Sequence, residues 1–139
     1  MAATTSFQAL VDSSAFIARL SPEDPFHPYA KQAFQSAKQQ SLQLVTTNLV
    51  VGETLTVLSH RGGQALAKLF LMHLERSGLP VIFVDDTLHQ ETIKVFTQQE
   101  KKGTSFVDCA NLVVVRKFSI PRVLGFDAFY KQHGCNTLH

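Results

Sequence analysis

The stretch from Thr104 to Asp127 constrains the fold of this chain most strongly. It begins with Ser105 and continues as an apolar segment of helical length that carries Asp108 in its first turn. After Pro121 a short apolar run leads to Asp127, so the order predicts a helix and then a strand, each with a carboxylate at one end. In a parallel α/β sheet, ligands bind outside the carboxyl ends of the strands. The stretch therefore predicts an α/β sheet with an acidic site at that edge.

Two further acids occupy comparable places in the chain. Asp12 directly follows the apolar run from Phe7 to Val11, which we expect to form a strand. Glu53 lies in the segment 48–60, which we expect to form a helix. The residues three and four positions away from Glu53 are mostly apolar: Leu49, Val50, Thr56 and Val57. Because these positions share one helix face, the Glu53 carboxylate must meet a base or a metal ion there, or take up a proton.

Each of the four acids also has a simpler explanation. Asp12 and Asp127 both precede expected helices, where aspartate is a common N-cap. Ser105 and Asp108 have the spacing of a capping box, in which Asp108 reaches back to the start of its helix. A buried Glu53 would also be explained by an ion pair with a distant arginine. The hypothesis of a cation site therefore rests on four acids in order on one α/β framework, without matching bases in their own segments.

Length and composition narrow the class of protein. A chain of 139 residues is expected to form a single domain, 1–139, large enough for a real core. No apolar run approaches the ~20 residues of a membrane helix. No basic region precedes the first apolar residues, so we expect no signal peptide and a cytoplasmic protein. Two cysteines are too few for a disulfide framework, and we expect both thiols to be reduced.

Four segments of the chain carry a resemblance to a known family. They are VDSSAF (11–16), LVTTNLVVGETLTVL (44–58), SFVDCANLVVVRKFSI (105–120) and LGFDAFYKQHGCNTL (124–138). Together they resemble PIN-domain proteins, in particular toxin ribonucleases of the VapC type. The resemblance implies a PIN-like three-layer α/β/α sandwich with a central, mainly parallel sheet. It also implies metal-dependent cleavage of RNA, a cognate antitoxin protein and a homodimer.

The resemblance assigns roles to individual residues. Asp12, Glu53, Asp108 and Asp127 fall on the acidic positions of the family, and Ser13 falls where a hydroxyl residue usually follows the first acid. Ser105 would support the site by capping the helix of Asp108. Mg²⁺ or Mn²⁺ prefers oxygen ligands, and we expect Asp12 and Asp108 to bind it most directly. Glu53 and Asp127 are expected to act partly through water.

One position departs from the family pattern. Relatives commonly carry Thr or Ser two residues before the last acid, whereas this chain has Gly125. A hydroxyl that would orient the site or the phosphate is therefore missing at this position. The departure predicts weaker activity or an altered metal preference.

Charge and apolar surface predict how partners bind. Setting the four acids aside leaves 7 acidic residues against 13 basic ones, a surface that suits a polyanion. Five basic residues lie just before and along the segment that carries two of the acids, and we expect them to hold RNA phosphates: Lys101, Lys102, Arg116, Lys117 and Arg122. The alternative is that they are ordinary solvated charges. Apolar residues around the expected helix 64–77 predict a dimer surface: Leu66, Phe70, Met72 and Leu74.

Two other functions remain open at this point. A receiver-like phosphoacceptor domain has a similar length, but its acidic pair follows the first strand. Here the pair Asp85–Asp86 follows a later apolar run, 81–84, which we expect to be a buried strand, and one of the two is expected to cap a helix. The second alternative is a catalytically weak or silent PIN-like module that only binds RNA or a partner, which Gly125 leaves open.

Overall fold

The sheet at the centre of the protein is entirely parallel. The computed structural model describes residues 6–138, and its five strands lie in the order β3-β2-β1-β4-β5. Their bounds are β1 (Ala9–Val11), β2 (Leu44–Thr47), β3 (Val81–Ile82), β4 (Arg122–Leu124) and β5 (Asn136–Thr137). All three residues of β1 are fully buried because this strand pairs with a neighbour on each side.

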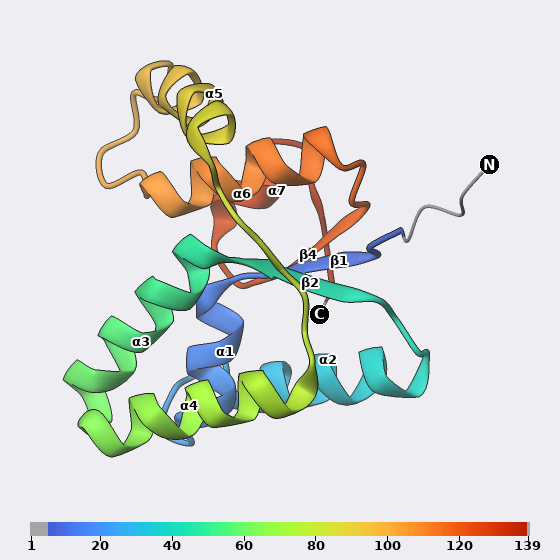
Figure 1. Cartoon of the computed structure of the whole chain (residues 1–139), viewed down its shortest axis with the longest axis vertical. Helices are drawn as coiled ribbons and strands as arrows, with labels where there is room; N and C mark the ends of the chain where they lie inside the picture. Colours follow the sequence, from blue (N-terminus) through green and yellow to red (C-terminus); the bar gives the residue numbers. More distant parts are fainter. Residues whose placement is uncertain (1–5, 139) are drawn as a thin grey trace.

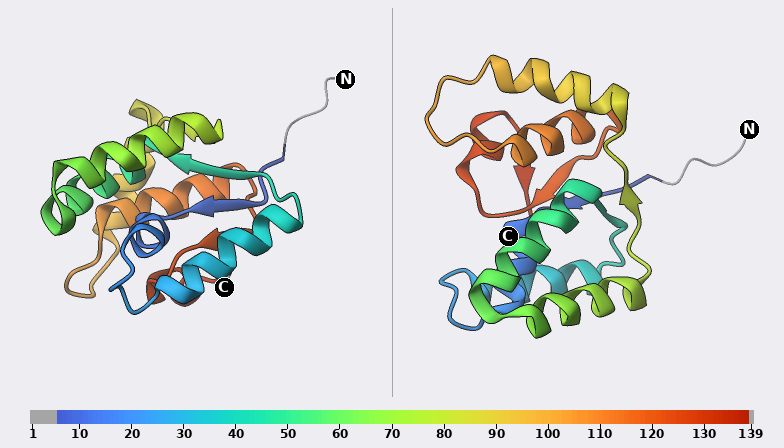
Figure 2. Two further views of the ribbon diagram at one scale, coloured as in Figure 1. Left: turned by 90° about the horizontal axis from the view of Figure 1, so that it is seen from below. Right: turned by 60° about the vertical axis from the view of Figure 1, so that its left-hand side comes forward.

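Helices cover both faces of the sheet. They are α1 (Ser13–Leu20), α2 (His27–Gln39), α3 (Asn48–Gly62), α4 (Gln64–Ser77), α5 (Asp86–Thr97), α6 (Phe106–Lys117) and α7 (Ala128–Gln132). Figure 1 shows α5, α6 and α7 above the sheet and α1 to α4 on its other side. The right-hand view of Figure 2 shows the same division. The predicted three-layer α/β/α sandwich with a parallel sheet is confirmed.

The alternation of side chains along the strands builds one core on each side of the sheet. Val11 of β1 and Leu124 of β4 pack into a cluster with α1 to α4, whereas their neighbours Leu10 and Val123 pack with α5, α6 and α7. Successive side chains of a strand point to opposite faces, so the three central strands β1, β2 and β4 contribute to both clusters. Each fully buried Leu or Val stabilises the fold by about 1.5–3 kcal/mol relative to an exposed one. Helix α6 is the most enclosed helix, since all eight residues from Asp108 to Val115 are buried.

The run 81–84 differs from our expectation of a buried strand. Only Val81 and Ile82 form β3, both are half-buried, and Phe83 is 70% exposed. β3 lies at the edge of the sheet and pairs with β2 alone, which leaves one side uncovered. A continuous apolar run does not distinguish an edge strand from a central one, because both carry apolar side chains. The other elements differ from their expected bounds mainly at the ends, such as α3, which continues to Gly62.

The strand order of the sheet changes direction at β1. From β1 the chain passes through α1 and α2 to β2 on one side, while β4 pairs with β1 on the other side. The carboxyl ends of β1 and β4 therefore lie side by side at a switch point of the strand order, where α/β proteins bind ligands. Within residues 6–138, no helix combines the length and apolar character that crossing a membrane requires.

Candidate active site

The four predicted acids lie around one pocket at this switch point. Asp12 follows β1, Asp127 precedes α7, Asp108 lies in the first turn of α6, and Glu53 lies in α3. All four line a pocket of about 480 Å³, together with Ser13, Ser14 and Ser105. Residues from four separate parts of the chain therefore converge at one place, as the hypothesis of a shared site requires.

Asp12 and Asp108 are the buried members of the set, with 2% and 6% of their surfaces exposed. Asp12 precedes α1, yet its side chain makes no capping hydrogen bond to that helix. Its Oδ2 accepts a hydrogen bond from Ser14 Oγ at 2.9 Å, and its Oδ1 accepts one from Asn111 Nδ2 at 3.1 Å. Helix capping therefore does not explain Asp12.

Asn111 and Tyr130 form a polar brace beneath the two buried acids. Tyr130 Oη donates to Asp108 Oδ1 at 2.9 Å and accepts from Asn111 Nδ2 at 2.9 Å. The amide of Asn111 thus donates to both Asp12 and Tyr130, and both brace residues are fully buried. The expected reach of Asp108 back to the start of its helix is wrong, because Tyr130 holds this carboxylate. Ser105 does cap α6, accepting from the Asp108 backbone N–H at 3.3 Å.

The electrostatics of the buried pair favour protonation or a bound cation. Burial raises the pKa of Asp12, Glu53 adds to this, and hydrogen bonds from Ser14 and the Ser13 backbone oppose it. Burial, followed by the charge of Asp12, raises the pKa of Asp108 from 3.8 to about 7. Burial also raises the pKa of the Tyr130 phenol well above its usual value, so that it remains a hydrogen-bond donor. Two buried carboxylates at neutral pH thus repel each other unless a proton or a cation joins them.

Glu53 and Asp127 lie nearer to solvent. Glu53 is half-buried, and its Oε2 accepts a hydrogen bond from Ser13 Oγ at 2.7 Å. Asp127 is exposed and caps α7, accepting from the Phe129 backbone N–H at 2.9 Å. Ser13 therefore orients one of the outer acids, while Asp127 combines a capping role with a place at the pocket.

Ser14 places a hydroxyl close to Gly125, which has no side chain of its own. A Cβ on Gly125 would lie 2.9 Å from Asp12 Cβ and 3.4 Å from Ser14 Oγ, so the backbone just after β4 passes very close to Asp12 and within contact distance of Ser14. Ser14 Oγ donates to Asp12 Oδ2 at 2.9 Å and accepts from the Phe126 backbone N–H at 3.0 Å. The hydroxyl thus comes from α1 instead of from the segment after β4.

The donor set fits a hard divalent cation. Within residues 6–138 the one salt bridge joins Arg61 to Asp24 at 3.0 Å, so no basic side chain there pairs with the four acids. In the same part of the chain no three His, Cys, Asp or Glu side chains are arranged to hold a metal ion as they stand. Carboxylate oxygens that repel one another at close range are nevertheless the ligands that Mg²⁺ and Mn²⁺ prefer.

The structure separates the five basic residues predicted to hold RNA. Lys101 and Lys102 are exposed in the loop before α6, near its first turn. Arg116 and Lys117 lie at the opposite end of α6, about 12 Å from Asp108 along the helix axis at 1.5 Å per residue. Arg122 begins β4, at the edge of the sheet opposite to the acids. These last three residues therefore do not belong to the pocket of the four acids. Arg116 and Lys117 are near Asp108 in sequence, but the length of α6 separates them from it in space.

Arg61 is a basic residue of the pocket that the sequence did not reveal. It lines the pocket together with Glu53 and Val57, and 50% of its side chain is exposed. These three residues are spaced by four along α3 and therefore share one helix face. This spacing of four residues in the sequence could have predicted that Arg61 lies on the same helix face as Glu53.

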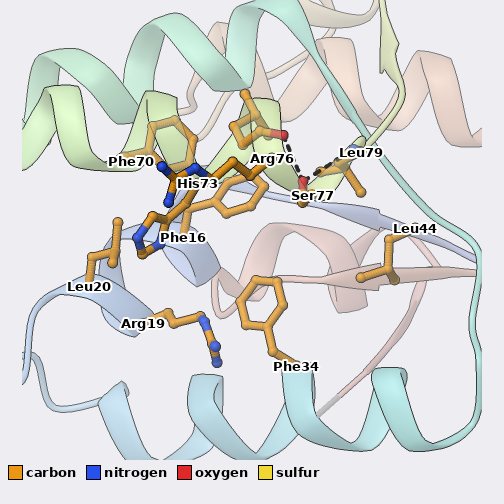
Figure 3. A pocket seen from close by; sticks show the side chains of 11 residues that line it. Phe16, Arg19, Leu20, Phe34, Leu44, Phe70, His73, Arg76, Ser77 and Leu79 are labelled. Carbon is orange, nitrogen blue, oxygen red and sulfur yellow. Dashed lines mark hydrogen bonds between the residues drawn. The ribbon is translucent and has the colours of Figure 1, made fainter.

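A second cavity, of about 540 Å³, is chemically different. Figure 3 shows the rings of Phe16, Phe34 and Phe70 around it, together with Arg19 and Arg76. No carboxylate lines this cavity, so it lacks the acidic oxygen ligands that Mg²⁺ and Mn²⁺ prefer. Because Phe70 is 2% exposed and packs here, it is not available for the dimer surface predicted on α4.

The rest of that predicted dimer surface is divided. Leu66 and Leu74 are partly buried against the core of the protein, whereas Met72 remains 37% exposed. Leu69 and Leu71 are exposed to a similar degree, at 39% and 38%. The apolar surface that α4 leaves uncovered thus consists of Leu69, Leu71 and Met72.

Comparison with known proteins agrees with this geometry. A family profile described as the PIN domain matches residues 9–132. Among curated proteins, the 23S rRNA-specific endonuclease VapC20 from two strains of Mycobacterium tuberculosis is 29% identical over 128 residues, which cover 89% of this chain and 92% of the relative. The crystal structure of M. tuberculosis VapC20, described as a sarcin-ricin loop cleaving toxin, superposes with a TM-score of 0.83 at 26% identity. It covers 91% of this chain and 95% of that one.

Proposed function

Because this chain belongs to the PIN-domain family, we propose that it is a metal-dependent endoribonuclease of the VapC toxin type. The observation that carries the proposal is the buried pair of Asp12 and Asp108, which lines one pocket with Glu53 and Asp127 and has no basic partner within residues 6–138. The likeness to a ribosomal RNA endonuclease covers nearly the whole chain, which supports the proposal of one domain, 1–139.

Each residue of the site has a defined task in this proposal. Asp12 and Asp108 hold Mg²⁺ or Mn²⁺ directly, while Glu53 and Asp127 complete the site partly through water. A bound divalent cation supplies a water of lowered pKa and positive charge to neutralise the phosphate. Ser13 fixes Glu53 through its 2.7 Å hydrogen bond, and Ser105 fixes the first turn of α6.

The brace of Asn111 and Tyr130 keeps the two buried carboxylates in position. Because the Tyr130 phenol donates to Asp108 Oδ1 and Asn111 donates to Asp12 Oδ1, one oxygen of each carboxylate is held from below. Ser14 holds the second oxygen of Asp12 from α1. A set of ligands that is already oriented loses little freedom when the cation binds.

The substrate is a structured RNA with an accessible single-stranded loop. The relative is described as specific for 23S rRNA and as a toxin that cleaves the sarcin-ricin loop, and we propose the same class of target for this chain. Bases in such loops are unstacked and can be reached by side chains. The intact set of four acids, together with the hydroxyl of Ser14, favours an active enzyme over the silent RNA-binding or partner-binding module.

The biological setting follows from the toxin type. We propose a cytoplasmic protein that is held inactive by a cognate antitoxin and forms a homodimer. The exposed side chains of Leu69, Leu71 and Met72 on α4 support a further protein contact. Light scattering of a dilute sample should give the mass of a dimer, and a monomer at about tens of micromolar protein would argue against this assembly.

The catalytic assignment is tested by a single substitution. Purified protein should cleave ribosomal RNA with Mg²⁺ or Mn²⁺ and not with EDTA, and Asp12→Asn should abolish this cleavage. The melting temperature of the metal-free variant should be equal or higher, because the change removes a buried charge near Glu53 and Asp108. Glu91→Gln, an exposed change on α5, should leave cleavage unchanged. Full activity of Asp12→Asn would refute the proposed site.

A further inference from the structure

An aromatic shelf borders the acid pocket, formed by Phe26, Tyr29 and Phe126. Phe26 and Phe126 both line the pocket that holds the four acids. Their rings stack with centroids 4.8 Å apart and planes inclined by only 7°. Tyr29 follows at 6.4 Å from Phe26. Phe26 remains 45% exposed and Tyr29 56% exposed, so the outer part of the shelf faces solvent beside the acids.

The shelf is held in place by a loop with its own hydrogen bonds. Asp24 Oδ1 accepts from the Phe26 backbone N–H at 2.9 Å, and Asp24 Oδ2 accepts from Arg61 Nη1 at 3.0 Å. His27 fixes the loop against α1, since its backbone N–H donates to the Asp24 carbonyl and its Nδ1 lies 2.7 Å from the Ala18 carbonyl oxygen. Phe26 therefore has a defined position before any ligand binds, which reduces the entropy lost on binding.

The same loop also connects the aromatic shelf to the positive charge of Arg61. Arg61 lines the acid pocket, and half of its side chain is exposed. Asp24 thus binds the backbone of Phe26 and the guanidinium of Arg61, so both residues are held at the rim of the same pocket. The ring of Phe26 suits a base, and the guanidinium of Arg61 suits a phosphate. The aromatic ring can stack on a base, and the positive charge can bind a phosphate. Together, beside the pocket proposed to cleave RNA, they match one nucleotide of a single strand.

We propose that the shelf is a binding subsite for a nucleobase, in which a base next to the scissile phosphate stacks on Phe26 while Arg61 contacts a neighbouring phosphate. The proposal rests on the proposed ribonuclease function and names how that site takes its substrate. Stacking on an aromatic ring tolerates any base, so the subsite recognises an unpaired nucleotide and not a particular sequence. Other exposed aromatic residues, such as Phe83 and Phe118, do not line the acid pocket, which distinguishes the shelf from scattered surface residues.

The test combines protein variants with a missing base. The cleavage site of the unchanged protein is mapped first, and RNAs are then made with an abasic residue at each position flanking it. Phe26→Ala removes the ring, and Phe26→Leu removes the aromatic face but keeps apolar cover over Phe126. Phe118→Ala is the matched control, because Phe118 is also 45% exposed and lies at the end of α6 away from the pocket. Melting temperatures show that all variants are folded.

The Phe26 variants should lose cleavage activity only when the RNA carries a base at one flanking position. Phe26→Ala and Phe26→Leu should lower kcat/KM for intact RNA by about 5- to 150-fold, the range of base–aromatic stacking. At one flanking position the abasic RNA should be cleaved equally slowly by the parent and by both variants. Phe118→Ala should resemble the parent on every RNA. If folded Phe26→Leu cleaves intact RNA as fast as the parent, the subsite is refuted while the ribonuclease function stands.

A binding experiment separates this proposal from the catalytic one. In Asp12→Asn, which should bind without cleaving, RNA carrying 2-aminopurine at the flanking positions should lose fluorescence on binding, since stacking quenches it. The same quenching should disappear when Phe26→Leu is added. Absence of cleavage by the unchanged protein would refute the proposed function, whereas unchanged quenching without Phe26 would refute the subsite. Loss of the dimer in Phe26→Leu with normal cleavage would instead assign the shelf to a protein contact.

Discussion

Asp108→Asn should make the metal-free protein more stable at neutral pH although it removes a residue of the site. Burial and the charge of Asp12 raise the pKa of the Asp108 carboxyl from 3.8 to about 7. The folded protein therefore keeps this proton at pH values where the unfolded chain has already lost it. The resulting stabilisation is fully present below about pH 4 and is lost as the pH rises through 7, because the unfolded state binds fewer protons over that window.

The size of the effect follows from the pKa difference. A change from 3.8 to about 7 corresponds to about 4 kcal/mol between the protonated and the charged state. The measured difference should be smaller, because Asp12 can hold the shared proton in place of Asp108. We expect Asp108→Asn to raise the free energy of unfolding by about 1–3 kcal/mol at pH 8 and to leave it nearly unchanged at pH 4. The amide oxygen of the variant can still accept from Tyr130, so packing is preserved.

Urea denaturation of both proteins in EDTA at the two pH values measures this difference. Asp86→Asn makes the same chemical change at an exposed position on α5 and should alter stability by less than about 1 kcal/mol at either pH. Adding Mn²⁺ should reverse the order at pH 8, because a cation that binds only the folded parent stabilises it. A variant that is less stable than the parent at pH 8 without metal would refute the argument that Asp108 is held at an energetic cost.

Three further predictions concern the surroundings of the acids. Gly125→Ala should lower kcat by about tenfold or more, since its Cβ would press on Asp12 Cβ at 2.9 Å and misplace a ligand. Tyr130→Phe should keep the fold but weaken Mn²⁺ binding measured by calorimetry by about 10- to 100-fold, the usual effect of losing a group that orients a ligand. Lys101→Ala with Lys102→Ala should reduce the salt dependence of RNA binding by a cleavage-dead protein, whereas the matched double change at the last two residues of α6 should not.

The four acids could be predicted from the sequence because their placement depends on rules of topology. Asp12 directly follows a strand, and Asp127 follows another strand by a short connection, so a parallel sheet brings both to the same edge. Glu53 was revealed by its position on an apolar helix face, and Asp108 by its place in a first helical turn. These inferences need only the direction of each element and the period of a helix or a strand.

The brace could not be predicted in this way. Asn111 reaches Asp12 across 99 residues of sequence, and Tyr130 reaches Asp108 across 22. Both residues looked like ordinary members of apolar helices, and only the packing of α6 against α7 and against the end of β1 brings their polar atoms to the acids. The prediction that Arg116 lies close to the acids was wrong for the opposite reason. Arg116 is close to Asp108 in sequence, but the rise of α6 places it at the far end of the helix.

Gly125 shows why a departure from a family pattern must be judged in space. The position lacks a hydroxyl, and its backbone lies so close to Asp12 that a Cβ would not fit without a shift. The same closeness lets Ser14, from the start of α1, reach Asp12 Oδ2 and the Phe126 backbone N–H with one hydroxyl. The glycine after β4 and the serine in α1 both pack against Asp12, so a side chain at position 125 would press first on the Asp12 Cβ. In this chain the hydroxyl that contacts the first acid therefore comes from Ser14 of α1.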